Sequence, residues 1–336
     1  MTHLPTRLQN FYKKSMLIAL TCALGLFCTC FAGTVFAQPF PNRTITIVVP
    51  TSAGGANDAM ARILAQGLSL KLGQTVIVEN KPGGNGAIAS EFVAKANPDG
   101  YTILFGYIAT HGINPALQKL KYDPITDFEP IGMVGISPTL LVVNPNLPVQ
   151  NAKELVTLLK ANPDSMSYGS AGKGTAPNLA GELFQINTGT KMVHVPYKGS
   201  APAIFDVMSG TIQIMFPSVF TAFPQIKAGK LKALGVAGDK RLKIMPNLPT
   251  LAEQGIPNMS VSQWYALFAP AKTPQPIIEL LNKNMNSILI TASVQKKFED
   301  QGSEVETSTP GELKAFVQSE VVRWKKLIDT AKISAD

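Results

Sequence analysis

Two glycine-rich stretches have the residue types and spacing for anion binding. TSAGGANDAMAR (51–62) follows the apolar run ITIVV. GSAGKGT (169–175) begins in the last two residues of the strand-like pattern MSYGS (166–170). Glycine permits close approach to the backbone, and a helix N-terminus presents free N–H groups with a partial positive charge. Each stretch therefore predicts a strand-loop-helix corner whose backbone amides could bind an anion. Turn chemistry alone is the alternative for the second stretch.

The first corner also contains polar side chains with local roles. Asn57 or Asp58 could cap the helix that follows, and Asp58 precedes Arg62 by four residues, the spacing of a helical ion pair. We expect a tight corner between strand 44–50 and helix 57–71. The loop PYKGSAPAIFD (196–206) is a third polar loop, in which Lys198 is either an anion partner or a solvated charge.

Three motif tests exclude better-known sites. GNGAIA (84–89) matches G-x-G-x-x-A, but extra loop residues precede it and no acid ends the next strand, ILFGY, which argues against dinucleotide binding. In the second stretch Lys173 is followed by glycine, so the phosphate-loop spacing is not met. GSAG is not G-x-S-x-G, so no hydrolase nucleophile elbow is present.

The histidines outside the N-terminal segment show no metal-binding pattern. His194 lies in a predicted strand, where a packed or hydrogen-bonded imidazole is expected. His111 follows a strand at its carboxyl end, where open α/β sheets bind ligands. Neither has the spaced histidine or cysteine partner of a metal site.

The first 37 residues are typical of a secretory signal. Basic residues without acids precede the apolar stretch 16–37, which ends in the small-residue site VFA before Gln38. An uncleaved membrane anchor is the alternative, because the stretch is long enough to span a bilayer. All three cysteines lie here, so a chain cleaved after Ala37 has no disulfide. The full chain carries a net charge of +8 without a basic run, which gives nucleic-acid binding little support.

Strands and helices alternate along the rest of the chain. Strands at 44–50, 75–79 and 101–107 alternate with helices at 57–71 and 86–96, which predicts parallel βαβ units. Two strand-like runs, 131–135 and 139–145, are separated by Ser137-Pro138, where we place the first crossing between domains. A second α/β unit follows, with helices at 152–162, 176–189 and 201–210 and strands at 166–170, 192–197, 211–216 and 231–238. A short helix and a returning strand are expected within 247–270, before closing helices at 274–290 and 310–332.

Several stretches together resemble one family, the solute-binding proteins of tripartite tricarboxylate transporters, also called Bug proteins. They span nearly all of the chain after the signal, in order. The matching segments are 45–62, 76–106, THGINPAL (110–117), YDPITDFEPIG (122–132), YGSAGKGT (168–175), 179–184, HVPYKGSAPAIFD (194–206), 228–236 and LPTLAEQGIP (248–257).

The resemblance implies an α/β, type II-like periplasmic binding protein fold with two Rossmann-like lobes joined by crossover strands. It implies residues 1–37 as signal peptide, 38–136 plus 262–336 as lobe 1 and 137–261 as lobe 2. The function implied is that of a monomeric periplasmic carrier, not an enzyme, which closes on a small carboxylate and delivers it to a two-subunit membrane permease without cofactor, metal or nucleic acid. The carboxylate would be a di- or tricarboxylate, aromatic ones included. A sensing component that presents its closed form to a membrane receptor is the alternative.

The resemblance also carries ligand-binding roles onto both glycine stretches, whose amides and waters would hold the carboxylate. The residues carried over are Ser52, Gly54, Gly55, Asn57 and Asp58 in the first stretch and Ser170, Gly174 and Thr175 in the second. The chain departs from the family pattern at Ala176, Pro177 and Asn178, where a histidine is frequent. Tyr107 and Phe220 suggest an aromatic or longer ligand, unless they are buried away from the site. The candidate set is completed by Tyr107, His111, Asn178, Tyr197 and Ser218.

Overall fold

The computed structural model describes residues 40–331, and the predicted signal segment lies outside this range. Within it the main chain forms a ten-stranded sheet with the order β2-β1-β3-β9-β4-β7-β5-β6, and both β8 and β10 pair with β4. The sheet has two halves, which we call the first half and the second half, and β4 belongs to both. In this part of the chain no helix is both long and apolar enough to cross a bilayer.

The first half is built from parallel strands with connecting helices. Strands β1 (Ile45–Val49), β2 (Val76–Asn80) and β3 (Thr102–Tyr107) pair in parallel, with β1 in the middle. Helices α2 (Ala56–Leu72) and α3 (Ala87–Ala94) connect them. The apolar residues of β1 are buried, as expected for a strand covered on both faces. The βαβ prediction is confirmed.

The second half repeats this arrangement. Strands β5 (Ser167–Ser170), β6 (Val193–Pro196) and β7 (Ile214–Met215) are parallel, and α6 (Ala176–Thr188) and α7 (Ser200–Ser209) connect them. Helix α5 (Ala152–Ala161) precedes β5. A cluster of buried side chains forms the core of this half, including Leu140 and Val142 of β4, Ile204 and Val207 of α7, and Met215 of β7.

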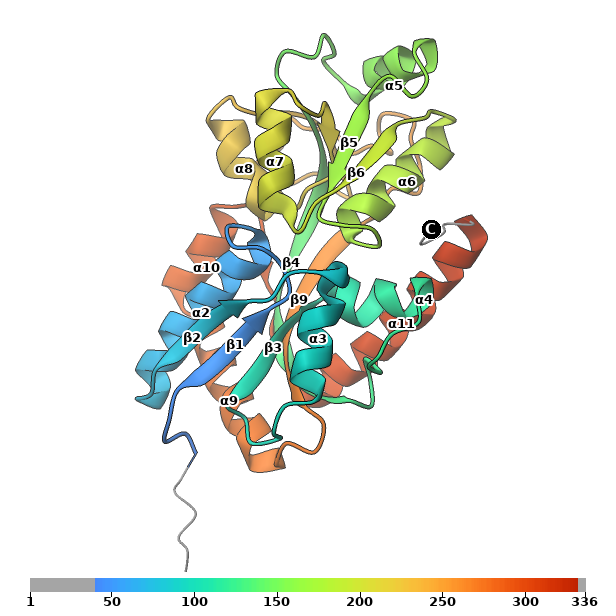
Figure 1. The fold of residues 1–336 in the computed structure, drawn as a ribbon. Helices are drawn as coiled ribbons and strands as arrows, with labels where there is room; N and C mark the ends of the chain where they lie inside the picture. Colours follow the sequence, from blue (N-terminus) through green and yellow to red (C-terminus); the bar gives the residue numbers. More distant parts are fainter. Residues whose placement is uncertain (1–39, 332–336) are drawn as a thin grey trace, which may run out of the picture. The chain divides into compact units, whose positions relative to one another are not determined.

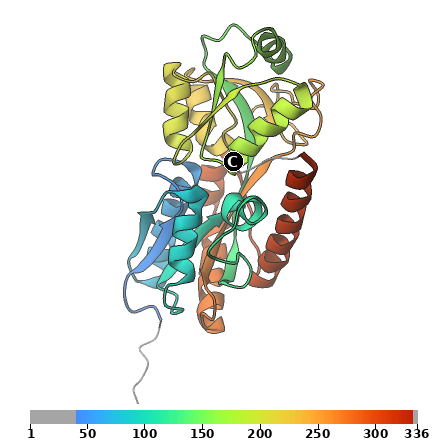
Figure 2. The same cartoon turned by 45° about the vertical axis from the view of Figure 1, so that its right-hand side comes forward.

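Two long strands join the halves, and one of them is continuous where the sequence predicted a break between two strands. Strand β4 (Phe128–Val143) runs without interruption through Ser137 and Pro138, beside β9 (Ser262–Pro270) (Figures 1 and 2). The prediction of two separate strands was wrong because Pro138 lies where β4 leaves β9 and pairs with β8 (Lys232–Ala237). A residue without an N–H is tolerated at such a change of partner.

The remaining differences concern short elements. Helix α8 (Val219–Lys227) was missed, and it contains Pro224, which obscures a helical pattern. Strand β7 has two residues rather than the predicted six. After β3 come a π-helical turn, η2 (Ala109–Ile113), and α4 (Asn114–Leu117), and a 3-10 turn, η1 (Gly84–Gly86), precedes α3. The C-terminal part contains α9 (Gln275–Leu289) and α11 (Pro310–Ala331) as predicted, with α10 (Ala292–Glu299) and β10 (Glu304–Val305) missed between them.

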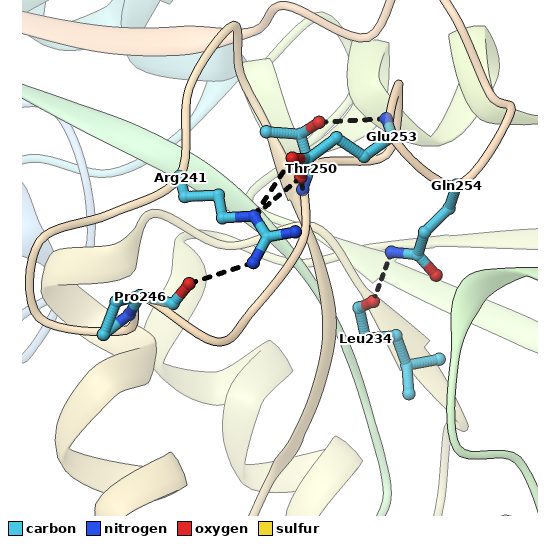
Figure 3. A network of polar contacts seen from close by, with 6 residues as sticks. All are labelled: Leu234, Arg241, Pro246, Thr250, Glu253 and Gln254. Atoms are coloured by element: carbon cyan, nitrogen blue, oxygen red, sulfur yellow. Dashed lines mark hydrogen bonds and ion pairs between the residues drawn. The ribbon is translucent and has the colours of Figure 1, made fainter.

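The segment between β8 and β9 forms turns where a short helix was predicted. Polar contacts hold it, as Figure 3 shows: Arg241 pairs with the Glu253 carboxylate at 2.9 Å, and Thr250 and Glu253 exchange hydrogen bonds between side chain and backbone. Gln254 donates to the Leu234 carbonyl at 2.8 Å. Side-chain contacts, rather than the repeating backbone hydrogen bonds of a helix, hold this segment in place.

Candidate functional site

The first glycine stretch forms the predicted corner, with Asp58 holding its loop. The Gly54 backbone is in the left-handed region (φ +85°), and its N–H donates to Asp58 Oδ2 at 3.0 Å. Arg62 pairs with the same carboxylate. Burial alone would raise the pKa of Asp58, but the hydrogen bonds from Arg62 and Gly54 outweigh it and hold that pKa below its usual value. Asp58 therefore shapes the corner from within.

Helix α2 begins at this corner without a side-chain cap. Its N-cap is Gly55, in extended conformation, and no side chain accepts a cap hydrogen bond there. The first N–H groups of a helix have no partner within the helix. Beside them, Thr51 Oγ1, Ser52 Oγ and Asn57 Nδ2 are buried without a hydrogen-bond partner in the protein. The corner thus gathers polar groups that a ligand or water could satisfy.

The second glycine stretch uses the same device. Gly174 is also left-handed (φ +72°), and its N–H donates at 2.8 Å to Oδ1 of Asn178, the third residue of α6. Asp58 occupies the corresponding position in α2. Thr175 is the N-cap of α6, but its hydroxyl donates to the Gly172 carbonyl at 2.6 Å and caps nothing. Two helices of 17 and 13 residues therefore begin uncapped behind similar loops.

A partly buried network supports the second corner. Ser170 Oγ lies 2.6 Å from His194 Nε2 and also accepts from the Gly172 N–H. The His194 ring stacks on Tyr168, whose hydroxyl bonds both Glu182 and Asn178. Burial, with a smaller effect of the Lys173 charge, lowers the pKa of His194 to about 4. His194 is therefore neutral at physiological pH, and the prediction of a hydrogen-bonded imidazole is confirmed.

The loops of the two halves touch. The Ser52 N–H donates to the Lys198 carbonyl at 3.1 Å. Asn85, a non-glycine residue with φ +54°, faces the second corner so closely that a Cβ at Gly172 would collide with its Oδ1. A Cβ at Gly174 would lie 2.9 Å from Leu117 Cδ1. The glycines of the second corner are therefore needed for contact with the first half.

Asn85 and Asn114 were not among the predicted site residues. The Asn114 amide donates to the Asn85 carbonyl at 3.0 Å, and its Oδ1 is buried without a partner. The Tyr107 hydroxyl contacts the same carbonyl at 3.4 Å. The repeated glycines of KPGGNG marked a turn, but nothing in the sequence indicated what the turn faces.

Tyr197 adjoins the second corner, where its N–H donates to the Ser170 carbonyl at 3.1 Å, whereas His111 and Ser218 contact other parts of the fold. His111 is fully buried, stacked on Phe268 with ring centres 3.9 Å apart, and burial lowers its pKa to about 3. The Tyr197 hydroxyl donates to Asp206 at 2.5 Å, and its ring packs on the second-half core. Ser218 is the N-cap of α8, with its hydroxyl 2.6 Å from that of Thr221.

The aromatic-ligand hypothesis loses most of its basis. Phe220 is 2% exposed and packs on Phe298, with ring centres 5.7 Å apart. Tyr107 is 3% exposed and supports the Asn85 loop. Neither ring presents an exposed aromatic surface. Phe220 is buried away from the site, which was the condition for rejecting the hypothesis, and Tyr107 only supports a loop of the site.

The crossover strands carry polar side chains that sequence reasoning missed. Thr139 on β4 and Gln263 on β9 are 0% and 5% exposed, and Thr139 Oγ1 and Gln263 Nε2 have no partner in the protein. The Tyr265 hydroxyl lies 3.4 Å from Gln263 Oε1. Among residues 40–331, no group of three or more histidines, cysteines and carboxylates is arranged to hold a metal ion.

The chain is similar to known proteins over most of its length. A family model described as the tripartite tricarboxylate transporter family receptor matches residues 60–333. Protein BugT of Bordetella pertussis is 34% identical over 314 residues, which cover 92% of this chain and 96% of BugT.

Solved structures agree. The periplasmic binding protein BugD is 36% identical, with a TM-score of 0.85 over 88% of this chain and 99% of BugD. Rpa4515 of R. palustris, solved with adipate, is 34% identical with a TM-score of 0.85 and the same coverage. MatC of Rhodopseudomonas palustris, solved with bound malate, is 33% identical with a TM-score of 0.83, covering 86% of this chain and all of MatC. These matches confirm the predicted two-lobed α/β fold, and the chain belongs to the tripartite tricarboxylate transporter receptors, the Bug family of periplasmic solute-binding proteins.

Proposed function

We propose that this protein captures a small carboxylate between its two glycine corners and delivers it to a tripartite tricarboxylate transporter permease. One observation carries the proposal: two uncapped helix starts, α2 and α6, lie behind touching loops from the two halves of the sheet. Relatives solved with adipate and with malate support a carboxylate as the ligand class.

The chemistry of the corners suits a carboxylate. Free N–H groups at a helix start donate to an anion, and the two partial positive charges favour it further. Ser52 Oγ and Asn57 Nδ2 are buried donors without partners in the protein, so they add to the same site. Arg62 is engaged by Asp58 and takes no part. Recognition thus uses neutral donors, which hold the anion without a reactive group.

Binding would be coupled to closure of two lobes, with lobe 1 at 38–136 plus 262–336 and lobe 2 at 137–261. The hinge would lie near 134–139 and 258–266, where β4 and β9 run between the halves (Figure 1). The contacts of Asn85 and Leu117 with the second corner then form only when the lobes close. The permease would recognise this closed form. The N-terminal segment would direct export and be removed by cleavage after Ala37.

Thermal unfolding of the exported chain against a panel of mono-, di- and tricarboxylates tests the proposal. A ligand at a hundred times its dissociation constant adds about 2.7 kcal/mol of stability. For a chain of this size the midpoint rises by on the order of 5 °C. The rise must vanish when every carboxylate of the ligand is replaced by an amide. If acid and full amide shift the midpoint equally, the corners do not read the charge and the proposal is wrong.

A further inference from the structure

Five polar residues on or beside the crossover strands β4 and β9 are not used by the proposed carboxylate site. In the β-ladder Tyr265 lies opposite both Tyr107 and Gly135, and Gln263 lies opposite Ser137. Residues 263 and 265 point to one face of the sheet because side chains alternate along a strand. Thr139, two residues beyond Ser137, bridges to Ser218. We call the set Tyr107, Tyr265, Gln263, Thr139 and Ser218 the crossover strip.

One end of the crossover strip lies at the first-half loops and the other at the second half. Tyr107 contacts the Asn85 carbonyl in the loop that faces Gly172 and Gly174. Ser218 is the N-cap of α8 in the second half. A ligand held by the two corners would therefore lie beside this strip, where the halves are joined.

Two atoms of the strip lack partners although they are buried. Thr139 Oγ1 and Gln263 Nε2 make no hydrogen bond within the protein, and leaving such groups unsatisfied is unfavourable. The Tyr265 hydroxyl donates to Gln263 Oε1, so the Gln263 NH₂ group points away from that hydroxyl. What the strip offers is therefore a pair of N–H donors and a hydroxyl, and all five of its members are uncharged.

We infer that Gln263 and Thr139 bind an oxygen acceptor at the far end of the ligand, and that they read hydrogen-bonding capacity rather than charge. The inference rests on the proposed function. A second carboxylate and a primary amide both present a suitable oxygen. A charged acceptor makes the stronger hydrogen bond, but desolvating a second charge without a counter-ion opposes this gain. The preferred class is therefore a carboxylate with any oxygen acceptor at its other end.

Calorimetric titration of the exported chain with three matched series tests this inference. The series are linear diacids of four to eight carbons, their half-amides, and monoacids of the same lengths. We expect the half-amide and the diacid of the best length to bind within about tenfold of each other, and both about tenfold tighter than the monoacid, the effect of one good hydrogen bond.

Two substitutions locate the effect. Gln263→Met keeps the length of the side chain without its donors, and it should weaken the diacid and half-amide about tenfold while leaving the monoacid unchanged. Thr139→Val removes an unpartnered hydroxyl, so it should weaken the same two ligands without lowering the melting temperature. Gln275→Met, on the exposed start of α9, is the matched control and should change nothing.

The outcomes separate this inference from the proposed function. A half-amide more than a hundredfold weaker than its diacid, a monoacid that binds equally well, or an affinity unchanged by Gln263→Met would each overturn the inference while the carboxylate site stands. If no acid in any series binds, the proposed function fails and the inference falls with it.

Discussion

Gly174 should be needed for ligand binding, beyond the need of its backbone conformation for glycine. Gly174→Ala adds a methyl group that would meet Leu117 Cδ1 at 2.9 Å, Asn85 Nδ2 at 3.1 Å and Asn114 Oδ1 at 3.3 Å, all from the first half. In a molecule with the lobes apart these contacts are absent, so the clash opposes closure only. Crowding of this kind costs about 1–3 kcal/mol, which weakens binding roughly 5- to 150-fold.

Gly229→Ala is the matched control. Gly229 has nearly the same backbone conformation, with φ +71° against +72° for Gly174, but nothing lies within 4 Å of its added Cβ. Both variants suffer the same backbone penalty of about 1–2 kcal/mol for an alanine in the left-handed region. Calorimetric titration with a carboxylate that the unsubstituted chain binds should show the loss of affinity in Gly174→Ala alone. Equal affinities for the two variants would refute the reasoning that these loops meet on closure.

Three further predictions concern the support of the site and the fold. Ser170→Ala removes the hydroxyl that joins His194 to the Gly172 amide, so we expect about tenfold weaker carboxylate binding in a titration, with the secondary structure unchanged in circular dichroism. The pKa of His194 is about 4 in the folded chain against 6.5 in the unfolded chain, so the unfolded chain binds one more proton and the free energy of unfolding falls as the pH drops from 6.5 towards 4. In urea unfolding, His194→Gln should flatten this part of the profile of stability against pH. An unchanged slope would contradict a neutral His194. Glu253→Ala breaks an exposed network, so it should lower the melting temperature only slightly and leave ligand affinity unaltered. A loss of affinity would place that segment in the binding site.

Sequence reasoning succeeded where local chemistry decides the structure. The apolar run before Ser52 and the glycines after it predicted a strand and a corner, and both exist because each step depends on neighbouring residues alone. The spacing of Asp58 and Arg62 likewise predicted their ion pair. Pro138 and Pro224 misled it, since one lies at a change of strand partner and the other inside a helix.

Long-range contacts explain the rest. His111 and Phe220 were placed near the site by their positions at the ends of strands, but packing against Phe268 and Phe298 buries them. Asn85 is a candidate only because it lies against Gly172, more than 80 residues away in the chain. Gln263 is a candidate only because its strand pairs with β4. No local pattern marks such a residue, because its partners are fixed by the fold.

Amide resonances of the chain labelled with ¹⁵N-glycine test the central claim most directly. Gly54 and Gly55 belong to the first corner, and Gly172 and Gly174 to the second. Titration with a carboxylate that raises the melting temperature should shift the signals of both corners with one dissociation constant, while Gly229 and Gly255 stay in place. Shifts confined to one corner, or to glycines outside both, would contradict capture of the carboxylate between them.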